Sequence, residues 1–200
     1  MQPETVNLSD ETLVQRSQTG DAEALEQLIT KYKDRLYNVV LRMCRNADDA
    51  AELTQESFVR IIENLDRFAG RSSFYTWAFR IAVNMTLNFC RRQSRAAISS
   101  LDLQISGNDE QAKAAMRSYL ADTSVRDPAA VAANKEQLDL IIRAINELDT
   151  EQRAVIILRD IEDMDYSQIA QILDVELGTV KSRLSRARAN LRENLEAIIR

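Results

Sequence analysis

The chain of 200 residues contains no histidine, two cysteines, four glycines and two prolines. Histidine is the general base of Ser-His-Asp triads, so its absence excludes that form of catalysis. Without histidine or a CxxC pair a structural zinc site lacks its usual ligands, and we expect neither metal nor cofactor. Cys44 and Cys90 stand alone, which predicts free thiols in a reducing cytoplasm. Arg91 could lower the pKa of the Cys90 thiol, although a buried, inert thiol is the simpler interpretation.

The scarcity of glycine and proline also limits the fold. These residues mark turns, and a β-sandwich, a propeller or a Rossmann-type sheet would need more of them. No window approaches the ~18 consecutive apolar residues of a membrane helix. Residues 1–20 lack the apolar core of a secretory signal. Hydrophobic residues make up 45% and charged residues 28% of the chain, as in ordinary soluble globular proteins.

Apolar residues recur at spacings of three and four almost throughout, which predicts an all-α protein. We expect N-caps at Ser9 or Asp10, at Asp21, at Asp127 before Pro128, and at Asp149. The pattern predicts helices over residues 10–20, 22–43, 50–65, 74–90, 128–148, 150–158, 166–173 and 179–198. Residues 46–49 are expected to form a polar break, and residues 66–73 a loop around Gly70.

The composition shifts after Arg95. Residues 96–126 include several serines, with Gly107, Asn108 and Asp109 in sequence, and are only weakly periodic. This predicts a flexible, acidic linker with a fragment of helix near residues 112–120. The expected organisation is therefore two small helical domains, residues 1–95 and 128–200, joined by a linker over residues 96–127.

The formal net charge of −5 argues against nucleic acid, but the charge is unevenly distributed. Residues 71–95 hold five arginines and no acid, and residues 179–192 hold five cations and no acid. Coulomb attraction is screened over ~8–10 Å in physiological salt, so each segment can act locally on an acidic chain. One such segment could be an ordinary solvated face, whereas two of them, one in each expected domain, indicate phosphate binding.

Residues 166–190 read YSQIAQILDVELGTVKSRLSRARAN and have the layout of a helix-turn-helix motif. A short helix over residues 166–173 precedes a turn over residues 174–178. Thr179 is expected to cap the second helix with its hydroxyl. The second helix of such a motif enters the major groove of DNA.

A helical wheel of this second helix separates an apolar stripe from a polar face. The stripe consists of Val180, Leu184, Leu191 and Leu195, as expected for a helix packed on a core. Small and basic residues occupy the remaining faces, namely Thr179, Lys181, Ser182, Arg183, Ser185, Arg186, Arg188, Ala189 and Arg192. Small residues allow close approach to a groove, and arginine can read guanine or hold phosphate. The alternative is a polar surface helix of a bundle.

Residues 67–92 read RFAGRSSFYTWAFRIAVNMTLNFCRR and combine aromatic with basic side chains. Such a surface can stack unpaired bases. The alternative is that the rings pack in a helical core, which we favour for Trp77 and Phe79, whereas Phe68 is expected to be freer in its loop. Asn84 lies among apolar neighbours and is either an internal hydrogen-bond partner or a base reader.

Four stretches together resemble the extracytoplasmic-function (ECF) sigma factors, the minimal class of bacterial sigma factor. They are DAEALEQLITKYKDRLYNVVLRM (21–43), AELTQESFVRIIENLDRF (51–68), SFYTWAFRIAVN (73–84) and RDIEDMDYSQIAQILDVELGTVKSRLSRAR (159–188). They cover essentially the whole chain in the family's order. The resemblance implies a helical bundle like sigma region 2 in the first domain and a helix-turn-helix like sigma region 4 in the second.

The resemblance also implies site residues for each domain. The 51–68 helix would dock on the clamp coiled coil of the largest polymerase subunit through Glu52, Gln55, Glu56, Phe58 and Asn64, which could otherwise be ordinary helix surface. The loop 66–73 would hold a base flipped from the −10 element, at a cost of a few kcal/mol in stacking. The residues implied for −10 binding are Phe68, Gly70, Arg71, Ser72, Ser73, Arg80 and Asn84. Those implied for the −35 element are Thr179, Lys181, Ser182, Arg183, Ser185, Arg186 and Arg188. Ser185 departs from relatives that carry a large apolar residue there.

The sequence therefore predicts a cytoplasmic, non-enzymatic sigma factor that binds core RNA polymerase and promoter DNA and starts transcription of a stress or envelope-response regulon. The family also implies an anti-sigma factor as partner. A dimeric helix-turn-helix regulator is one alternative, but it would leave residues 21–95 without a role. A helical enzyme is the other, but the chain has no paired carboxylate motif, nucleophile elbow or phosphate loop.

Overall fold

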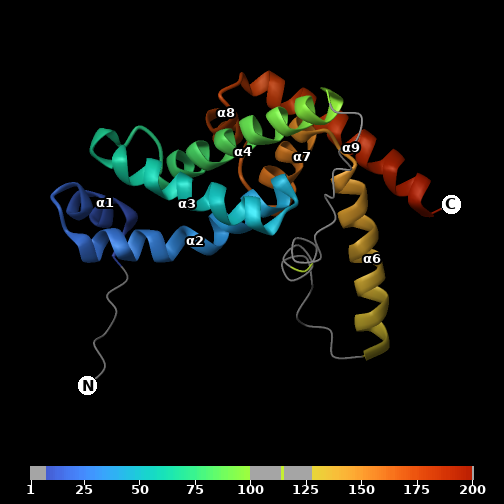
Figure 1. Ribbon diagram of the computed structural model, residues 1–200, viewed down its shortest axis with the longest axis horizontal. Coiled ribbons are helices and arrows are strands. Elements are labelled where there is room, and N and C mark those ends of the chain that lie inside the picture. Colours follow the sequence, from blue (N-terminus) through green and yellow to red (C-terminus); the bar gives the residue numbers. More distant parts are fainter. Residues whose placement is uncertain (1–7, 100–113, 115–127, 200) are drawn as a thin grey trace.

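The computed structural model describes residues 8–99, 114 and 128–199, and every regular element among them is helical (Figure 1). The N-terminal half, residues 8–99, contains α1 (Asp10–Gln18), α2 (Ala22–Cys44), α3 (Ala47–Glu63), a 3₁₀ turn (Leu65–Arg67) and α4 (Phe74–Ser99). The C-terminal half, residues 128–199, contains α6 (Pro128–Asn146), α7 (Thr150–Ile156), a π-helical turn (Ile157–Ile161), α8 (Tyr166–Leu173) and α9 (Leu177–Ile199). The prediction of an all-α fold is confirmed.

Three helices, α1, α2 and α7, begin at the predicted capping residues. The side chain of Ser9 accepts a hydrogen bond from the backbone N–H of Thr12 at 3.3 Å. Asp21 accepts from two backbone N–H groups of α2 at 3.1 Å, and Asp149 accepts from Gln152 at 2.8 Å. Each cap satisfies donors that the first turn leaves unpaired and is worth ~1 kcal/mol. The start of α6 at Pro128 agrees with the sequence, while Asp127 lies outside the described residues.

Two helices are longer than their periodicity suggested. The expected polar break contains the start of α3, because Asn46 caps the helix by accepting from the backbone N–H of Asp49 at 3.0 Å. Acidic side chains in that first turn interact favourably with the helix dipole. At the other end of the half, α4 continues past Cys90 to Ser99. The helix fragment predicted near residues 112–120 lies outside the described residues apart from Ala114, which is helical.

The turn of the helix-turn-helix is shorter than predicted. Asp174 adopts a left-handed conformation with φ of 56°, which aspartate tolerates, and it ends α8 in one residue. The second helix then begins at Leu177, and the backbone N–H of Thr179 donates to the carbonyl of Glu176 at 2.8 Å. Thr179 therefore lies inside the first turn of α9, and its predicted role as N-cap is wrong.

The two halves pack on one another and share a continuous hydrophobic cluster. α4 contacts α2 and α3 of its own half and α7 and α8 of the other half, so it lies at the centre of the molecule (Figure 1). Its residues Phe79 and Val83 are completely buried. In the C-terminal half, α9 packs against α6, α7 and α8. Because of this position, the C-terminal half decides which side chains of α4 stay exposed.

A buried arginine joins the ends of helices from both halves. The Arg153 guanidinium donates to the carbonyl of Met43 at 3.0 Å, and to those of Asn146 and Leu148 at 3.0 and 2.7 Å. A cation suits this position because helix C-termini present unpaired carbonyls and a partial negative charge. Burial lowers the pKa of Arg153 to about 10, so the group stays charged at neutral pH.

Candidate nucleic-acid and polymerase interface

The predicted polar face of α9 is confirmed as exposed. Val180, Leu184 and Ala187 are buried against the rest of the C-terminal half, and Leu191 and Leu195 are half-buried. Ala187 extends the apolar stripe that the helical wheel identified. The exposed residues are Lys181, Ser182, Ser185, Arg186, Arg188, Ala189 and Arg192, whereas Thr179 and Arg183 are half-buried. The helix therefore presents small and basic groups on the side away from its core.

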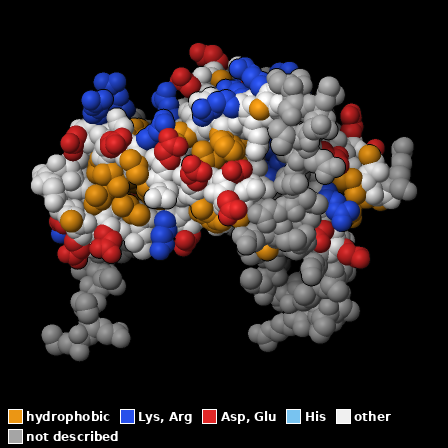
Figure 2. All heavy atoms as spheres, in the orientation of Figure 1, with side chains coloured by type: hydrophobic (Ala, Val, Ile, Leu, Met, Phe, Trp, Pro, Cys, Tyr) orange, Lys and Arg blue, Asp and Glu red, His pale blue; other side chains and the backbone are white. Residues whose placement is uncertain are grey.

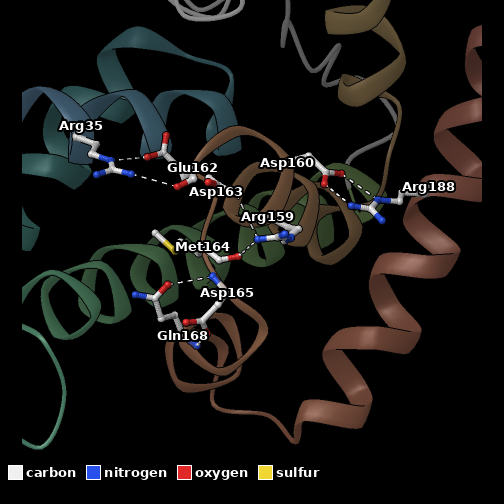
Figure 3. A network of polar contacts seen from close by, with 9 residues as sticks. All are labelled: Arg35, Arg159, Asp160, Glu162, Asp163, Met164, Asp165, Gln168 and Arg188. Atoms are coloured by element: carbon white, nitrogen blue, oxygen red, sulfur yellow. Dashed lines mark hydrogen bonds and ion pairs between the residues drawn. The ribbon is translucent and has the colours of Figure 1, made fainter.

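Two arginines of α9 are paired with carboxylates of the same half. The Arg188 guanidinium makes a two-pronged contact with Asp160 in the π-helical turn, with Nε 3.2 Å from Oδ2 (Figure 3). This hydrogen bonding raises the pKa of Arg188. Arg183 lies 2.9 Å from Glu151 at the start of α7. In contrast, the Arg186 guanidinium donates to Ser182 of its own helix, and the residue is exposed, so its guanidinium faces outward.

The predicted −10 residues line two clefts in the N-terminal half. Phe68, Gly70, Ser72 and Ser73 line a cleft of about 580 Å³ next to α1. Gly70 has φ of 68°, a left-handed conformation that glycine adopts without strain. Arg71, in the same loop, is exposed. The loop between the 3₁₀ turn and α4 therefore forms one wall of a cleft large enough for a flat polar ligand.

Gln18 holds this loop in place, a contact that no local sequence pattern indicates. Its side-chain amide donates to the carbonyls of Leu65 and Phe68 at 2.8 and 3.0 Å. The Phe68 ring is less free than predicted, because it is half-buried and lies 5.0 Å from the ring of Trp77. Trp77 is itself half-buried, whereas Phe79 is fully buried, as predicted.

The second cleft, of about 490 Å³, brings together Arg80 and Asn84 of α4 with Asn64, a residue predicted to bind polymerase. Trp77 lines this cleft and contacts Phe68 of the first, so an aromatic pair separates the two. Arg60 and Arg67 also line it and add basic groups that the sequence analysis did not assign. Figure 2 shows lysine and arginine side chains gathered along the upper edge of the molecule, over the loop before α4 and toward α8 and α9.

Arg80 and Asn84 also touch the C-terminal half. The Asn84 side-chain amide donates to the carbonyl of Ile172 in α8 at 2.8 Å and to that of Arg80 at 2.9 Å. The Arg80 guanidinium lies 3.0 Å from the carboxylate of Asp174. Of the two roles left open for Asn84, the hydrogen bond is therefore observed, while base reading remains a prediction.

The predicted polymerase face of α3 is polar with apolar residues between. Glu52, Gln55 and Glu56 are exposed, and Phe58 is half-buried. Val59 and Ile62 are large apolar side chains that remain 47% and 41% exposed. The sequence analysis missed both, because their helical spacing alone does not distinguish them from core residues. Unpartnered apolar side chains beside acids and amides are typical of a surface that binds another protein.

The two thiols are buried. Burial raises the pKa of Cys44 to about 12 and also raises the pKa of Cys90. Arg91 does not lower the pKa of the Cys90 thiol below its ordinary value. Its guanidinium instead pairs with Glu151 at 2.7 Å. Within the described residues, no group of potential metal ligands is clustered. In that same part of the chain, no helix has both the length and the apolar character needed to cross a bilayer.

Comparison with known proteins places both halves in families. Residues 28–96 match the family model for Sigma-70 region 2, and residues 138–191 match the model for Sigma-70, region 4. Two solved structures share the fold. CnrH in complex with the cytosolic domain of CnrY has a TM-score of 0.65 at 23% identity, covering 94% of this chain and 97% of CnrH. The sigma factor RpoE in complex with the anti-sigma factor NepR from Bartonella quintana has a TM-score of 0.63 at 24% identity, covering 86% and 96%.

Curated relatives match over nearly the full length. The ECF RNA polymerase sigma-E factor of Salmonella typhimurium is 33% identical over 193 residues, covering 96% of this chain and 97% of the relative. The sigma-E factor of Escherichia coli strain K12 is 32% identical over the same length, with the same coverage. That of Haemophilus influenzae is 30% identical over 195 residues, covering 96% and 98%. Sigma factors are non-enzymatic initiation factors, in agreement with the prediction that the chain is not an enzyme. The chain belongs to the family of ECF RNA polymerase sigma factors.

Proposed function

We propose that the chain binds core RNA polymerase, directs it to promoters with a −10 and a −35 element, and starts transcription of a stress or envelope-response regulon. The observation that carries the proposal is the presence of an exposed basic surface in each half, around α4 and on α9. Paired surfaces of this kind fit one protein that contacts two separate stretches of DNA. The sigma-E names of its relatives support the same function.

The −35 element is assigned to α9. Exposed Ser182 and Ser185 allow the helix to approach a groove, and Arg186, on the same face, points outward with its guanidinium available for a guanine edge. Lys181 and Arg188 line a shallow cleft along one flank, suited to phosphate contacts. Thr179 and Arg183 line the opposite flank. Arg186 lines the same cleft as Thr179 and Arg183, which supports a role for this side of the helix in base reading.

The −10 element is assigned to the two clefts of the N-terminal half. A flipped base loses stacking energy, and this loss is offset when a pocket encloses the base and an aromatic ring stacks on it. The cleft beside Phe68, Gly70 and Ser72 supplies the pocket, and the Phe68–Trp77 pair supplies aromatic surface. Arg71 is exposed at the rim, where it can hold the backbone.

Polymerase binding is assigned to α3. The helix presents acids and amides for a basic or polar partner helix, and Val59 and Ile62 supply apolar area. Such a mixture suits an interface with a small apolar centre and a polar rim. An anti-sigma factor is a further partner, because the sigma factor RpoE, which has this fold, was solved in complex with the anti-sigma factor NepR.

The test is reconstitution of the full chain with core polymerase on a library of promoter fragments, followed by mapping of transcript starts. We expect starts at a fixed distance from two recurrent sequence elements. Val59→Asp, at an exposed position, is expected to abolish these starts by weakening polymerase binding. The matched control, Ile199→Asp, changes an apolar residue that is 70% exposed at the end of α9. Tight binding of the chain alone to duplex DNA, with no specific transcript, would instead favour a regulator that acts without polymerase.

A further inference from the structure

The first helix, α1, lies outside the residues that match the region 2 model, yet it forms one wall of the cleft beside Phe68. The match begins at residue 28, whereas α1 spans Asp10–Gln18. α1 packs on α2 and also contacts the 3₁₀ turn and α4, at one end of the molecule (Figure 1). Its polar side chains that line the cleft are Asp10, Glu11, Gln15 and Gln18. The family match therefore does not account for this wall.

Side-chain hydrogen bonds fix α1 at both of its ends. At its start, the Asp10 carboxylate accepts from the ammonium group of Lys31 at 2.6 Å and from the hydroxyl of Tyr32, both on α2. At its end, the Gln18 amide nitrogen donates to one carbonyl of the 3₁₀ turn and to the carbonyl of Phe68. A helix fixed in this way holds the groups of a binding site more precisely than a loop does. α1 and the loop at Phe68 therefore form two joined walls of one cleft.

The two clefts of the N-terminal half differ in charge. Among the described residues, those that line the first cleft include carboxylates, amides and hydroxyls but no lysine or arginine. Those that line the second cleft include Arg60, Arg67 and Arg80 but no carboxylate. Phosphate oxygens are attracted by arginine and repelled by carboxylates, whereas a neutral base can form hydrogen bonds with either group. The first cleft therefore suits a base, and the second suits the sugar-phosphate backbone.

Glu11 and Gln15 are the exposed polar residues on the α1 wall of the first cleft. They are four residues apart, so they project from the same face of the helix. An ionised carboxylate only accepts hydrogen bonds, whereas an amide both donates and accepts. Adenine, cytosine and guanine each carry an exocyclic amino group that donates to a carboxylate. Thymine has no amino group, and keto oxygens flank its single ring N–H, so a carboxylate at this wall disfavours it.

We propose that α1 selects the base held in the first cleft. The Glu11 carboxylate, with Gln15 beside it, accepts a hydrogen bond from the exocyclic amino group of the base and so excludes thymine. Gln18 is a positioning residue, because it fixes the loop at Phe68 against which the base is held. The inference rests on the proposed function, since it requires a base of the −10 element in this cleft. It adds a base-selecting residue outside the part of the chain that matches region 2.

The first experiment compares base preferences. The full chain with core polymerase selects bound fragments from a promoter library whose −10 element is randomised within an unpaired bubble. We expect thymine to be depleted at one position, and Glu11→Ala to remove this depletion while the other positions keep their preferences. Glu26→Ala is the matched control, because it removes an exposed carboxylate of α2 that lines neither cleft. Identical preferences for Glu11→Ala and Glu26→Ala would overturn the proposal.

The second experiment removes the amino group from the DNA. At the selected position, adenine is replaced by purine, cytosine by 2-pyrimidinone or guanine by hypoxanthine, each of which lacks the exocyclic amino group. This replacement should weaken binding by the complex of the unsubstituted chain about tenfold, as expected for a base contact of this kind. With Glu11→Ala the same replacement should have no effect, because the partner of the amino group is already missing. An equal loss in the two complexes would show that Glu11 does not contact the base and would overturn the proposal.

The third experiment tests the positioning residue. Gln18→Leu keeps much of the side-chain volume but removes both hydrogen bonds to the loop. Base preference should broaden at the selected position, while binding to core polymerase alone stays unchanged. Gln27→Leu, at another half-buried glutamine that lines neither cleft, is the matched control.

The outcomes separate this inference from the proposed function. An equal loss of preference at every position in Gln18→Leu would show that α1 only supports the fold, and would overturn its role in the site. If circular dichroism shows that Gln18→Leu does not fold, the two experiments on Glu11 decide the question. If the unsubstituted chain selects no recurrent −10 element and starts no specific transcript, the proposed function itself fails, and the assignment of α1 fails with it.

Discussion

Residues 71–95 and 179–192 carry the same excess of positive charge but pack in different ways. The first segment becomes the loop before α4 and most of α4, which packs against helices on several sides while all five of its arginines stay exposed. The second segment becomes α9, which is buried along one stripe and leaves its basic groups on an open face. Equal charge therefore does not imply an equal role. α4 is a core helix that packs on both halves and exposes its arginines at the edges of these contacts, whereas α9 is a surface helix with one buried stripe and one open face.

The largest expected effect tests this difference in burial. Phe79→Ala on α4 removes a completely buried ring and should lower the free energy of unfolding by about 3–5 kcal/mol, measured by denaturant titration. Leu191→Ala, at a half-buried position of α9, should lower the free energy of unfolding by about 1 kcal/mol, because folding removes less apolar area from water at this position. If both variants lost the same stability, the contrast between the two helices would not hold.

The fold could be predicted from sequence wherever local interactions decide it. Ser9, Asp21 and Asp149 cap helices in the structure because a capping side chain acts within three residues of itself. The apolar stripe of α9 was predictable for the same reason, since it follows from a period of 3.6 residues. The start of α9 was not predictable in this way. The left-handed Asp174 ends α8, and α9 then begins at Leu177, two residues earlier than Gly178 and Thr179 suggested.

The site was predictable in composition but not in arrangement. The basic and polar residues of α9 are exposed as expected. No local sequence pattern indicates that Arg183 and Arg91 both pair with Glu151. Arg42 and Glu162 are 120 residues apart in the chain, so their pairing depends on how the halves meet. Gln18 positions the loop at Phe68 across a separation of 50 residues. Periodicity reports which face of a helix is buried, not which distant segment covers it.

A second, smaller effect sharpens the role of α9. Arg186→Ala should weaken promoter binding by the polymerase complex by about 1–3 kcal/mol and relax the preference at one base of the −35 element. The reason is that its guanidinium faces outward, where it can make two hydrogen bonds to guanine. Selection of bound sequences from a randomised −35 library measures both changes. Arg143→Ala, which removes an exposed arginine of α6, serves as control and should leave the preference intact. A uniform loss across all sequences would show that Arg186 holds phosphate and does not read a base.

The smallest effect on stability concerns the native thiol of α4, Cys90, which can be compared with a thiol introduced on α9. Burial raises the pKa of Cys90 on α4 above its ordinary value of 9.0. A thiol introduced as Ser185→Cys on the exposed face of α9 should titrate normally and react quickly with a maleimide at pH 8, whereas Cys90 should react only after unfolding.

The raised pKa of Cys90 also sets the sign of a pH effect on stability. The folded chain keeps the Cys90 proton while the unfolded chain loses it, so the contribution to stability is complete below pH 9 and declines as pH rises further. Denaturant titrations at pH 8 and pH 10 should show this decline, and Cys90→Ala should reduce it. Rapid labelling of Cys90 in the folded chain would show that α4 opens readily. The two helices would then differ less in solvent access than their packing indicates.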